Sequence, residues 1–280
     1  MRNKEEILKE IAKGSDDAEM EIISLGLGVQ STALYFMSCL GDLPRADYAI
    51  FSDTGAEHKY TYEYLSYLQK FQKENNGIPI IVVKNKEGLY KDSLKDNLVR
   101  IPAYVEFEDG TSIMNRSCTK NYKIDPFYRK IRELLGLKKG ERSKKKVNAW
   151  IGITVDEIQR VKESSVPLLV NRYPFIGMLW KRSDCINYYI KHNFPSPKKS
   201  SCVFCPYQSD SSFLDMKKNH KQDWNKAIKV DEYIRNRFTK EGQQTKSYIW
   251  KRYIPIKDAH FENEEQVDMF ENECEGHCGL

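Results

Sequence analysis

The segment Glu21–Ser31, EIISLGLGVQS, decides the fold of this chain. The apolar run Met20–Ile23 predicts a strand, and it leads directly into two closely spaced glycines, Gly26 and Gly28. Ser31 then opens an apolar stretch with the spacing of a helix. Backbone amides in such a turn, together with a helix N-terminus, bind an anion without any charged side chain. The segment therefore predicts a phosphate-binding loop.

Glycines suit such a loop, because they adopt positive φ and let a phosphate approach the backbone closely. The segment matches neither G-x-x-x-x-G-K-[ST] nor G-x-G-x-x-G, which excludes the usual P-loop and dinucleotide fingerprints. Taken alone, the same residues are equally compatible with a simple turn that joins a strand to a helix.

Composition limits the class of protein. The chain has 280 residues, 40% of them hydrophobic and 30% charged, which suits one large α/β domain or a domain with an appendage. No run approaches the roughly 20 apolar residues of a membrane span, and the charged start MRNKEEILKE lacks the apolar core of a signal peptide. We therefore expect a cytoplasmic protein without a membrane partner. Its seven cysteines are expected to be reduced thiols, metal ligands or catalysts.

The charge balance leaves the partner open. A formal net charge of +5 permits a nucleic-acid partner without requiring one. The basic run Lys138–Lys146 is either a solvated loop or a contact for a phosphate backbone.

Apolar runs alternate with helical patterns along the first half of the chain. They predict strands over 47–52, 78–84 and 147–153, and helices over 3–13, 31–40, 59–75 and 125–135. The run 78–84 lacks alternation, which predicts burial on both faces, and 85–120 is expected to be irregular. The order predicts an α/β fold with a doubly wound parallel sheet and ligands at its C-terminal edge. We expect a nucleotide-binding domain over 1–165 and a cysteine-bearing helical region over 166–280, with helices over 211–219 and 222–238.

Polar residues follow two of the predicted strands. Asp53 ends the second strand, where a carboxylate is well placed for a ribose hydroxyl or a magnesium ion, although a helix N-cap is the alternative. The fourth strand ends in Gly152-Ile153-Thr154, and Arg160 follows it. Arg160 could fork onto a phosphate or form a surface ion pair with Asp156.

Cysteine spacing indicates a metal site. In Cys202-Val203-Phe204-Cys205-Pro206, two thiolates separated by two residues can hold one metal or cluster iron. Cys118 and Cys185 lie upstream, so four sulfurs are present for a 4Fe–4S cluster or a structural zinc. Spacing does not separate these two metals, and buried inert thiols are a third interpretation. Cys39 lies on the apolar face of the first helix and is expected in the core.

Two more thiols lie close to the end of the sequence. Cys274 and Cys278 flank His277, which could favour the thiolate form. A tail of this kind suits a swinging nucleophile or a persulfide carrier. An accessory metal site or a disordered tail are the alternatives.

Several of these motifs occur together in a fixed order. S-L-G-L-G-V-Q-S is followed by D-T-G-x-E, by R-S-C-T-x-x-Y-K over Arg116–Lys123, by G-I-T-x-D-E-x-x-R and by C-x-x-C-P. This series, over residues 20–206, resembles the phosphoadenosine phosphosulfate reductase-like branch of the adenine nucleotide alpha hydrolases, the PP-loop ATP pyrophosphatases. The resemblance implies a doubly wound fold of the HUP type that holds an adenine nucleotide over the sheet edge.

The resemblance also implies roles for individual residues. The cofactor is expected to be ATP with Mg²⁺, held by Ser24, Gly26, Leu27, Gly28, Gln30, Ser31, Asp53, Thr54 and Gly152. The expected cluster ligands are Cys118, Cys202 and Cys205, with Cys185 as the fourth, and zinc is the alternative metal. Asp53, Arg160 and Cys278 are the expected catalytic residues, and the tail resembles the Glu-Cys-Gly segment of the reductases.

The sequence also departs from this family. The usual loop reads S-G-G-x-D-S, whereas Gly26, Leu27 and Gln30 stand here in the places of Ser, Gly and Asp. The reductases carry adjacent cysteines, whereas Cys118 stands alone. Both differences favour relatives that use ATP to activate an oxygen for replacement by sulfur.

The sequence therefore predicts an ATP pyrophosphatase that adenylates a nucleic-acid oxygen before sulfur replaces it. DNA phosphorothioation is the first choice of pathway and tRNA thiolation the second, with a cysteine desulfurase or another sulfur donor as partner. The chain could also form a homodimer. Two alternatives stay open, which are reduction of adenylylated sulfate by a C-terminal cysteine and a non-enzymatic nucleic-acid-binding module with a four-cysteine zinc site.

Overall fold

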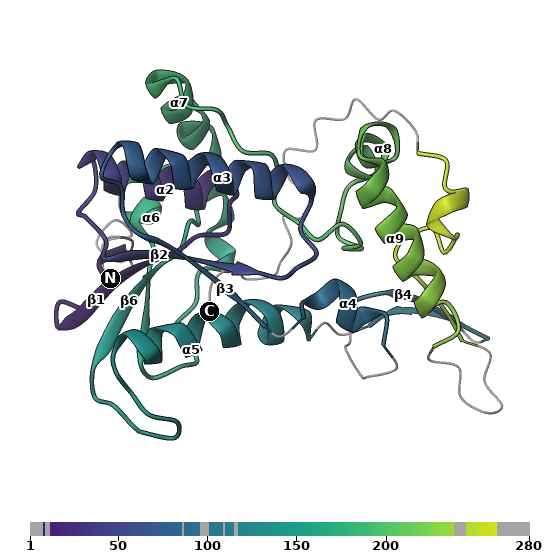
Figure 1. Cartoon of the computed structure of the whole chain (residues 1–280), viewed down its shortest axis with the longest axis horizontal. Coiled ribbons are helices and arrows are strands. Elements are labelled where there is room, and N and C mark those ends of the chain that lie inside the picture. The colour runs from purple at the N-terminus through teal and green to yellow at the C-terminus, as the bar shows by residue number, and fades with distance from the viewer. Residues whose placement is uncertain are drawn as a thin grey trace, which may run out of the picture.

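A computed structural model describes Leu8 and residues 12–85, 87–95, 101–108, 110–114, 117–237 and 245–261. Figure 1 shows two units side by side, an α/β unit that contains the main sheet and a smaller unit that contains α8 (Asp210–Asn219) and α9 (Lys221–Ile234). In the described part of the chain, no helix is both long and apolar enough to cross a membrane.

The main sheet has five strands in the order β3-β2-β1-β6-β7, and all neighbouring pairs are parallel. The strands are β1 (Ala18–Ser24), β2 (Tyr48–Asp53), β3 (Ile80–Lys84), β6 (Lys146–Trp150) and β7 (Leu169–Arg172). The chain runs outward from β1 to β3 and then returns to the other side of β1. The strand order therefore reverses between β1 and β6, which is where open α/β sheets bind ligands.

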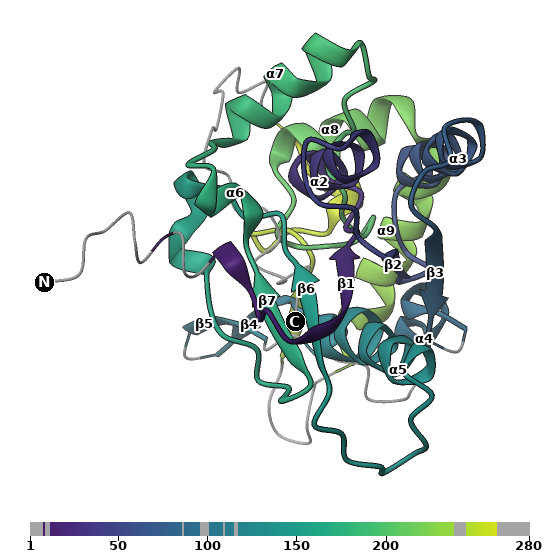
Figure 2. The same cartoon turned by 90° about the vertical axis from the view of Figure 1, so that its left-hand side faces the viewer.

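Helices cover both faces of this sheet (Figure 2), which confirms the predicted doubly wound α/β class. Ile22 and Ile23 show why both faces need cover, because successive residues of a strand point to opposite sides. Ile23 packs with the core under α2 (Val29–Leu40) and α3 (Lys59–Glu74). Ile22 packs instead with Phe127 and Ile131 of α5 (Asp125–Leu134). Strands without alternation are thus buried between two helical layers.

The edge strand differs from its prediction. The apolar run 78–84 predicted burial on both faces, but β3 is the first strand in the sheet order. Val82 is 42% exposed, and none of the residues from Ile80 to Lys84 is fully buried. The apolar run encodes strand propensity here, while the position in the sheet order sets the degree of burial.

The α/β unit continues beyond residue 165. β7 pairs with β6, and it is followed by the short α6 (Pro174–Gly177) and by α7 (Arg182–His192). The hydroxyl of Tyr189 in α7 donates to the carbonyl of Val29 at 2.7 Å, which attaches α7 to the start of α2. The division into 1–165 and 166–280 stays a prediction, and the last strand of the main sheet lies after that boundary.

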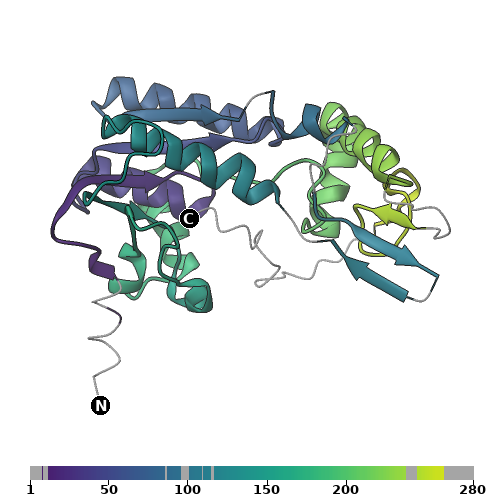
Figure 3. The same ribbon diagram turned by 90° about the horizontal axis from the view of Figure 1, so that it is seen from below.

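The smaller unit combines segments that are far apart in sequence (Figure 3). Its three-stranded antiparallel sheet has the order β5-β4-β8, and α4 lies against α9. These elements are α4 (Leu89–Ser93), β4 (Tyr104–Phe107), β5 (Gly110–Ile113) and β8 (Lys246–Tyr248). Residues 85–120 were expected to be irregular, and the structure places α4, β4 and β5 there. The predicted helices over 211–219 and 222–238 are confirmed as α8 and α9, although α9 ends at Ile234.

Candidate functional site

The predicted phosphate loop joins β1 to α2. Leu27, and not a glycine, has the positive φ in this turn, at 59°. Gly28 has a φ of −93° and a ψ of 176°, which any residue adopts, so the expectation that Gly28 is needed for positive φ is wrong. Among the described residues, no heavy atom lies within 4 Å of the position that a Cβ would occupy on Gly28. Gly28 therefore leaves an open cradle in front of the helix, which a side chain would fill.

The cradle lies at the N-terminus of α2. The first amides of a helix lack acceptors within the helix, and no side chain among the described residues caps the start of α2. Ser31 shapes the turn, because its Oγ accepts from the amide of Gly26 at 3.1 Å. Ser24 ends β1 and is buried directly before the loop. A helix N-terminus without a side-chain cap is an anion site by its dipole and its amides.

Gly152 lies against the same helix start. A Cβ on Gly152 would approach the amide nitrogen of Ser31 to 2.7 Å and the carbonyl carbon of Gln30 to 2.9 Å. Only glycine therefore lets the segment after β6 pack on the backbone of α2. This contact gives Gly152 a packing role at the predicted nucleotide site.

A network of charged and amide groups lies beside the loop. Gln30, the second residue of α2, is buried. Its Nε2 donates to Glu157 Oε2 at 3.1 Å, and its Oε1 accepts from Arg182 Nη1 at 3.1 Å. Arg160 pairs with the same Glu157 rather than with Asp156. Gln30 is thus linked directly to Arg182, and through Glu157 to Arg160, at the second residue of α2.

The sequence patterns predicted no role for Arg182. It begins a helix that is distant in sequence from the loop, and it reaches Gln30 only because α7 packs on α2. No local pattern around Arg182 signals this contact.

Asp53 and Thr54 leave the end of β2, next to β1. Asp53 accepts hydrogen bonds from the amide of Gly55 at 2.7 Å and from the hydroxyl of Tyr62 at 2.8 Å. Lys84 Nζ lies 3.4 Å from its other oxygen. Asp53 is not the N-cap of α3, since that position belongs to His58. The carboxylate is therefore oriented at the strand end without capping a helix.

Three cysteines line one pocket between the two units. Its wall consists of Thr54, Leu89, Ile101, Pro102, Cys118, Thr119, Lys123, Ser201, Cys202, Phe204, Cys205 and Pro206. The cavity volume is about 30 Å³, enough for a water-sized group. Cys118, Cys202 and Cys205 are the three residues that the motifs predicted as ligands. The fold thus brings together thiols that are separated by more than eighty residues of sequence.

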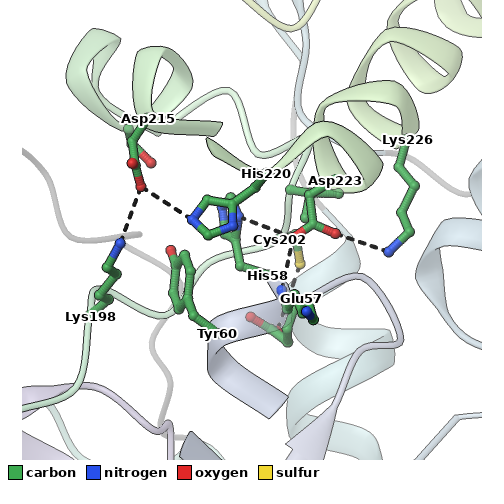
Figure 4. Close-up of polar contacts among 12 residues, drawn as sticks. Glu57, His58, Tyr60, Lys198, Cys202, Asp215, His220, Asp223 and Lys226 are labelled. Carbon is green, nitrogen blue, oxygen red and sulfur yellow. Dashed lines mark hydrogen bonds and ion pairs between the residues drawn. The ribbon is translucent and has the colours of Figure 1, made fainter. Parts of the chain in front are cut away.

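Cys202 has a polar environment on one side. Its Sγ lies 3.4 Å from Thr54 Oγ1 and 3.9 Å from Glu57 Oε1. Burial and the Glu57 carboxylate raise the pKa of this thiol well above its ordinary value, so Cys202 is protonated unless a cation faces it. Lys123, whose Nζ lies 3.9 Å from the same Glu57 oxygen, acts in the opposite direction. Figure 4 shows Glu57 close to Cys202.

Cys185 lies elsewhere. It is fully buried in the core between α2 and α7, and burial raises the pKa of its thiol. It does not line the pocket of Cys118, Cys202 and Cys205. Cys39 packs against the same core as Cys185, as expected, and accepts from the amide of Ile78 at 3.3 Å.

The donor set is compatible with a soft metal. Thiolates are the ligands that iron–sulfur clusters and zinc prefer. Among the residues that the structure describes, however, no three His, Cys, Asp or Glu side chains lie close enough together to hold a metal ion. The three cysteines therefore share a pocket without converging on one point.

Some predicted residues lie elsewhere in the chain. Arg116, Cys274, His277 and Cys278 are outside the described residues. The basic run Lys138–Lys146 joins the end of α5 to the start of β6, so it lies at the N-terminal edge of the sheet. Two of its lysines, Lys145 and Lys146, pair with acidic residues near β1. The basic run is thus at the opposite edge from the phosphate loop.

Comparisons with known proteins give structural similarities only. No protein-family model and no curated protein sequence matches the chain. A phosphoadenylyl-sulfate (PAPS) reductase from Candida auris, in a phosphate complex, superposes with a TM-score of 0.42 and 14% identity, over 70% of this chain and 83% of the reductase. The U34-tRNA thiolase NcsA from Methanococcus maripaludis, with its 4Fe–4S cluster, superposes with a TM-score of 0.43 and 13% identity, over 85% of this chain and 78% of the thiolase. Solved structures that resemble this chain therefore include a PAPS reductase and a tRNA thiolase.

Proposed function

We propose that this chain is a PP-loop ATP pyrophosphatase that adenylates an oxygen of a nucleic acid so that sulfur can replace it. One observation supports the proposal: the cradle at Gly28 and the pocket of three cysteines lie at the same edge of the sheet. The cradle at Gly28 follows β1, and the pocket of three cysteines begins at Thr54, directly after the neighbouring β2. An anion site and a set of thiols are the two parts that ATP-driven sulfur insertion needs.

In the first step, the acceptor oxygen attacks the α-phosphorus of ATP, and the bond to the β-phosphate breaks. AMP is then attached to the acceptor, and pyrophosphate leaves. The amides at the start of α2 would hold the departing pyrophosphate, with Arg160 and Arg182 beside them. The Asp53 carboxylate at the end of β2 is an oxygen ligand of the kind that Mg²⁺ prefers. Positioning and charge neutralisation carry this step.

In the second step, a sulfur nucleophile attacks the activated centre, and AMP leaves with the former oxygen. The sulfur comes from a cysteine desulfurase or another donor, and Cys278 on the C-terminal tail is our candidate carrier, as a persulfide. After its outer sulfur bonds to the acceptor, the thiol of Cys274 breaks the S–S bond and forms a Cys274–Cys278 disulfide, which an external thiol then reduces.

Cys118, Cys202 and Cys205 are our candidate ligands for a 4Fe–4S cluster, or zinc, whose binding would have to draw the three thiols together and would supply a cationic site for thiolates and for sulfide. Deprotonation of Cys202 needs such a positive charge, because burial and Glu57 favour the neutral thiol.

The proposal also names the acceptor nucleic acid, the cellular location and the oligomeric state. DNA is our first choice, which makes the reaction a step of DNA phosphorothioation, and tRNA is the second. We place the protein in the cytoplasm and allow for a homodimer.

The test is pyrophosphate release from ATP and Mg²⁺ in the presence of sulfide, with duplex DNA, with bulk tRNA or with neither. We expect release that depends on one of the two nucleic acids and that Gly28→Val abolishes. Release of sulfite from adenylyl sulfate or phosphoadenylyl sulfate, without pyrophosphate from ATP, would instead establish a reductase. No turnover in either assay, together with tightly bound zinc, would identify a nucleic-acid-binding module and overturn the proposal.

A further inference from the structure

Gln208 lies three residues after Cys205 and is buried. Its Nε2 donates to the carbonyl oxygens of Cys202 and Val203, both at 3.1 Å, and to that of Cys205 at 3.4 Å. One side-chain amide thus donates to three carbonyl oxygens of a single loop, Cys202–Cys205, which we call the cysteine loop. Carbonyls that point to one nitrogen fix the curvature of the loop, and the curvature sets the directions of its thiols.

The three carbonyls also determine which way the Gln208 amide points. A carbonyl only accepts, so the atom of Gln208 that faces the loop must be the NH₂ group. Its Oε1 then faces the other way, where His58 Nε2 lies at 2.8 Å and Ser212 Oγ at 3.0 Å. Because Oε1 is an acceptor, His58 must carry its hydrogen on Nε2.

His58 lies where the start of α3 meets α9. It is the N-cap residue of α3, is 1% exposed, and its ring stacks on Tyr60 with 4.8 Å between centroids. Its Nδ1 lies 3.8 Å from Asp223 Oδ2 of α9 and, in the described part of the chain, makes no hydrogen bond. Asp223 also accepts from the amide of Lys59 at 2.8 Å, at the first turn of α3. Figure 4 shows His58 and Asp223 facing each other.

We propose that His58 and Gln208 are positioning residues that hold the Cys202–Cys205 loop in one shape and connect it to the α3–α9 junction. The connection runs from the His58 ring, at the N-cap of α3, through the Gln208 amide to the three loop carbonyls. The role of this connection in catalysis rests on the function proposed above, because the loop carries two of the three pocket thiols. The geometry itself does not depend on that function.

The first test needs no substitution. A long-range ¹H–¹⁵N correlation spectrum of the full-length protein, at a pH above the titration of His58, reports which ring nitrogen is protonated. We expect the Nε2–H tautomer for His58. A ring protonated on Nδ1 alone would overturn the proposal, because Gln208 Oε1 would then have no donor on His58.

The second test measures the loop directly. His58→Phe keeps a ring that can stack on Tyr60 but removes the donor, and Gln208→Met keeps the length of the side chain but removes the amide. In the metal-free full chain, we expect iodoacetamide to alkylate Cys205 about tenfold faster in either variant, as expected for a loop that has lost one buried hydrogen-bonding group. Peptide mass spectrometry assigns the alkylation rate to each cysteine.

Two further variants make the result specific. His58→Gln restores a donor to Gln208 and should bring the alkylation rate back toward that of the parent protein. Tyr173→Phe removes a different buried hydrogen bond, from the Tyr173 hydroxyl to the carbonyl of Lys162, and should leave the rate unchanged. Unchanged Cys205 rates in both His58→Phe and Gln208→Met would overturn the proposal. If these variants do not fold, the tautomer of His58 in the parent protein decides whether the proposal holds. Neither measurement involves ATP or nucleic acid, so both are independent of the proposed function.

Discussion

At the scale of single residues, Gly28 links the fold most directly to function. Its backbone conformation suits any residue, and the space in front of it is open. Gly28→Val should therefore fold normally and weaken ATP binding by more than tenfold, because a branched side chain occupies the place of the phosphate. Isothermal titration with ATP measures the affinity, and thermal unfolding checks the fold.

Gly41 provides the matched control at the other end of the same helix. It is the C-cap of α2 with a φ of 90°, so alanine there is strained. Gly41→Ala should lower the free energy of unfolding by about 1 kcal/mol and leave the ATP affinity unchanged. Equal ATP affinity in the parent protein and Gly28→Val would refute the phosphate-loop assignment.

The cysteines allow a second prediction at this scale. Cys202→Ala and Cys205→Ala should each lose bound iron or zinc, and the proteins should become less soluble, because the free energy of metal binding also stabilises the fold. Metal analysis and the visible absorbance of anaerobically purified protein measure the loss.

Cys185 and Cys39 are the controls for the metal site. Cys185→Ala should keep its metal and lose about 1 kcal/mol of stability, because it opens a small cavity in the core between α2 and α7. Cys39→Ala should also keep its metal. Loss of metal from Cys185→Ala would restore Cys185 as the fourth ligand, whereas full metal in the Cys202/Cys205 double variant would eliminate the pocket as a metal site.

At the scale of elements, the junction between α3 and α9 should respond to pH. Burial lowers the pKa of His58 below its ordinary 6.5, against the opposing influence of Gln208, Asp223 and Glu57 and with a small contribution from His220. The unfolded chain therefore binds a proton on His58 more readily than the folded protein does. Stability is fully present above pH 6.5 and falls as the pH drops from 6.5 toward the lowered pKa.

His58→Phe isolates this effect, because phenylalanine does not titrate. Urea unfolding at pH 8 should show the variant less stable than the parent protein by about 1 kcal/mol, the usual value of a lost hydrogen bond. The difference between the two proteins should shrink as the pH falls below 6.5. A difference that grows on acidification would mean that His58 is charged in the folded protein.

At the scale of the whole molecule, the proposed reaction divides between the two units. The phosphate cradle belongs to the α/β unit, and most of the cysteine pocket belongs to the smaller unit. If the tail carries sulfur between them, Cys278→Ser should stop sulfur transfer and leave pyrophosphate release nearly intact, since a hydroxyl is a far poorer nucleophile than a thiolate at neutral pH. Transfer of ³⁵S to the nucleic acid and pyrophosphate release are measured in the same reaction.

A chain truncated after Glu271 provides the companion variant, since it removes Cys274 and Cys278 together. We expect it to behave like Cys278→Ser in both assays. Full sulfur transfer by the truncated chain would show that the tail is dispensable and that the pocket thiols receive sulfur without it.

The sequence determined much of the α/β unit by itself. Apolar runs and helical spacing predicted β1, β2, α2, α3 and α5 to within a few residues, because these elements bury continuous apolar faces. It missed β4, β5, β7 and β8, which are three or four residues long and contribute little periodicity. It also placed β3 in the interior, because an apolar run shows strand propensity and not the strand order.

The candidate site divides in the same way. Local patterns identified the loop at Gly26–Ser31, the strand-end Asp53 and Thr54, and the paired Cys202 and Cys205, since each depends on residues that are close in sequence. Only the tertiary structure separated Cys185 from the other cysteines, added Arg182 beside Gln30, and joined His58 to the cysteine loop through Gln208. Those contacts form between segments far apart in the chain, and packing of α7 on α2 and of α9 on the start of α3 creates them. The sequence thus set the chemical groups, and the packing of helices decided which of them meet.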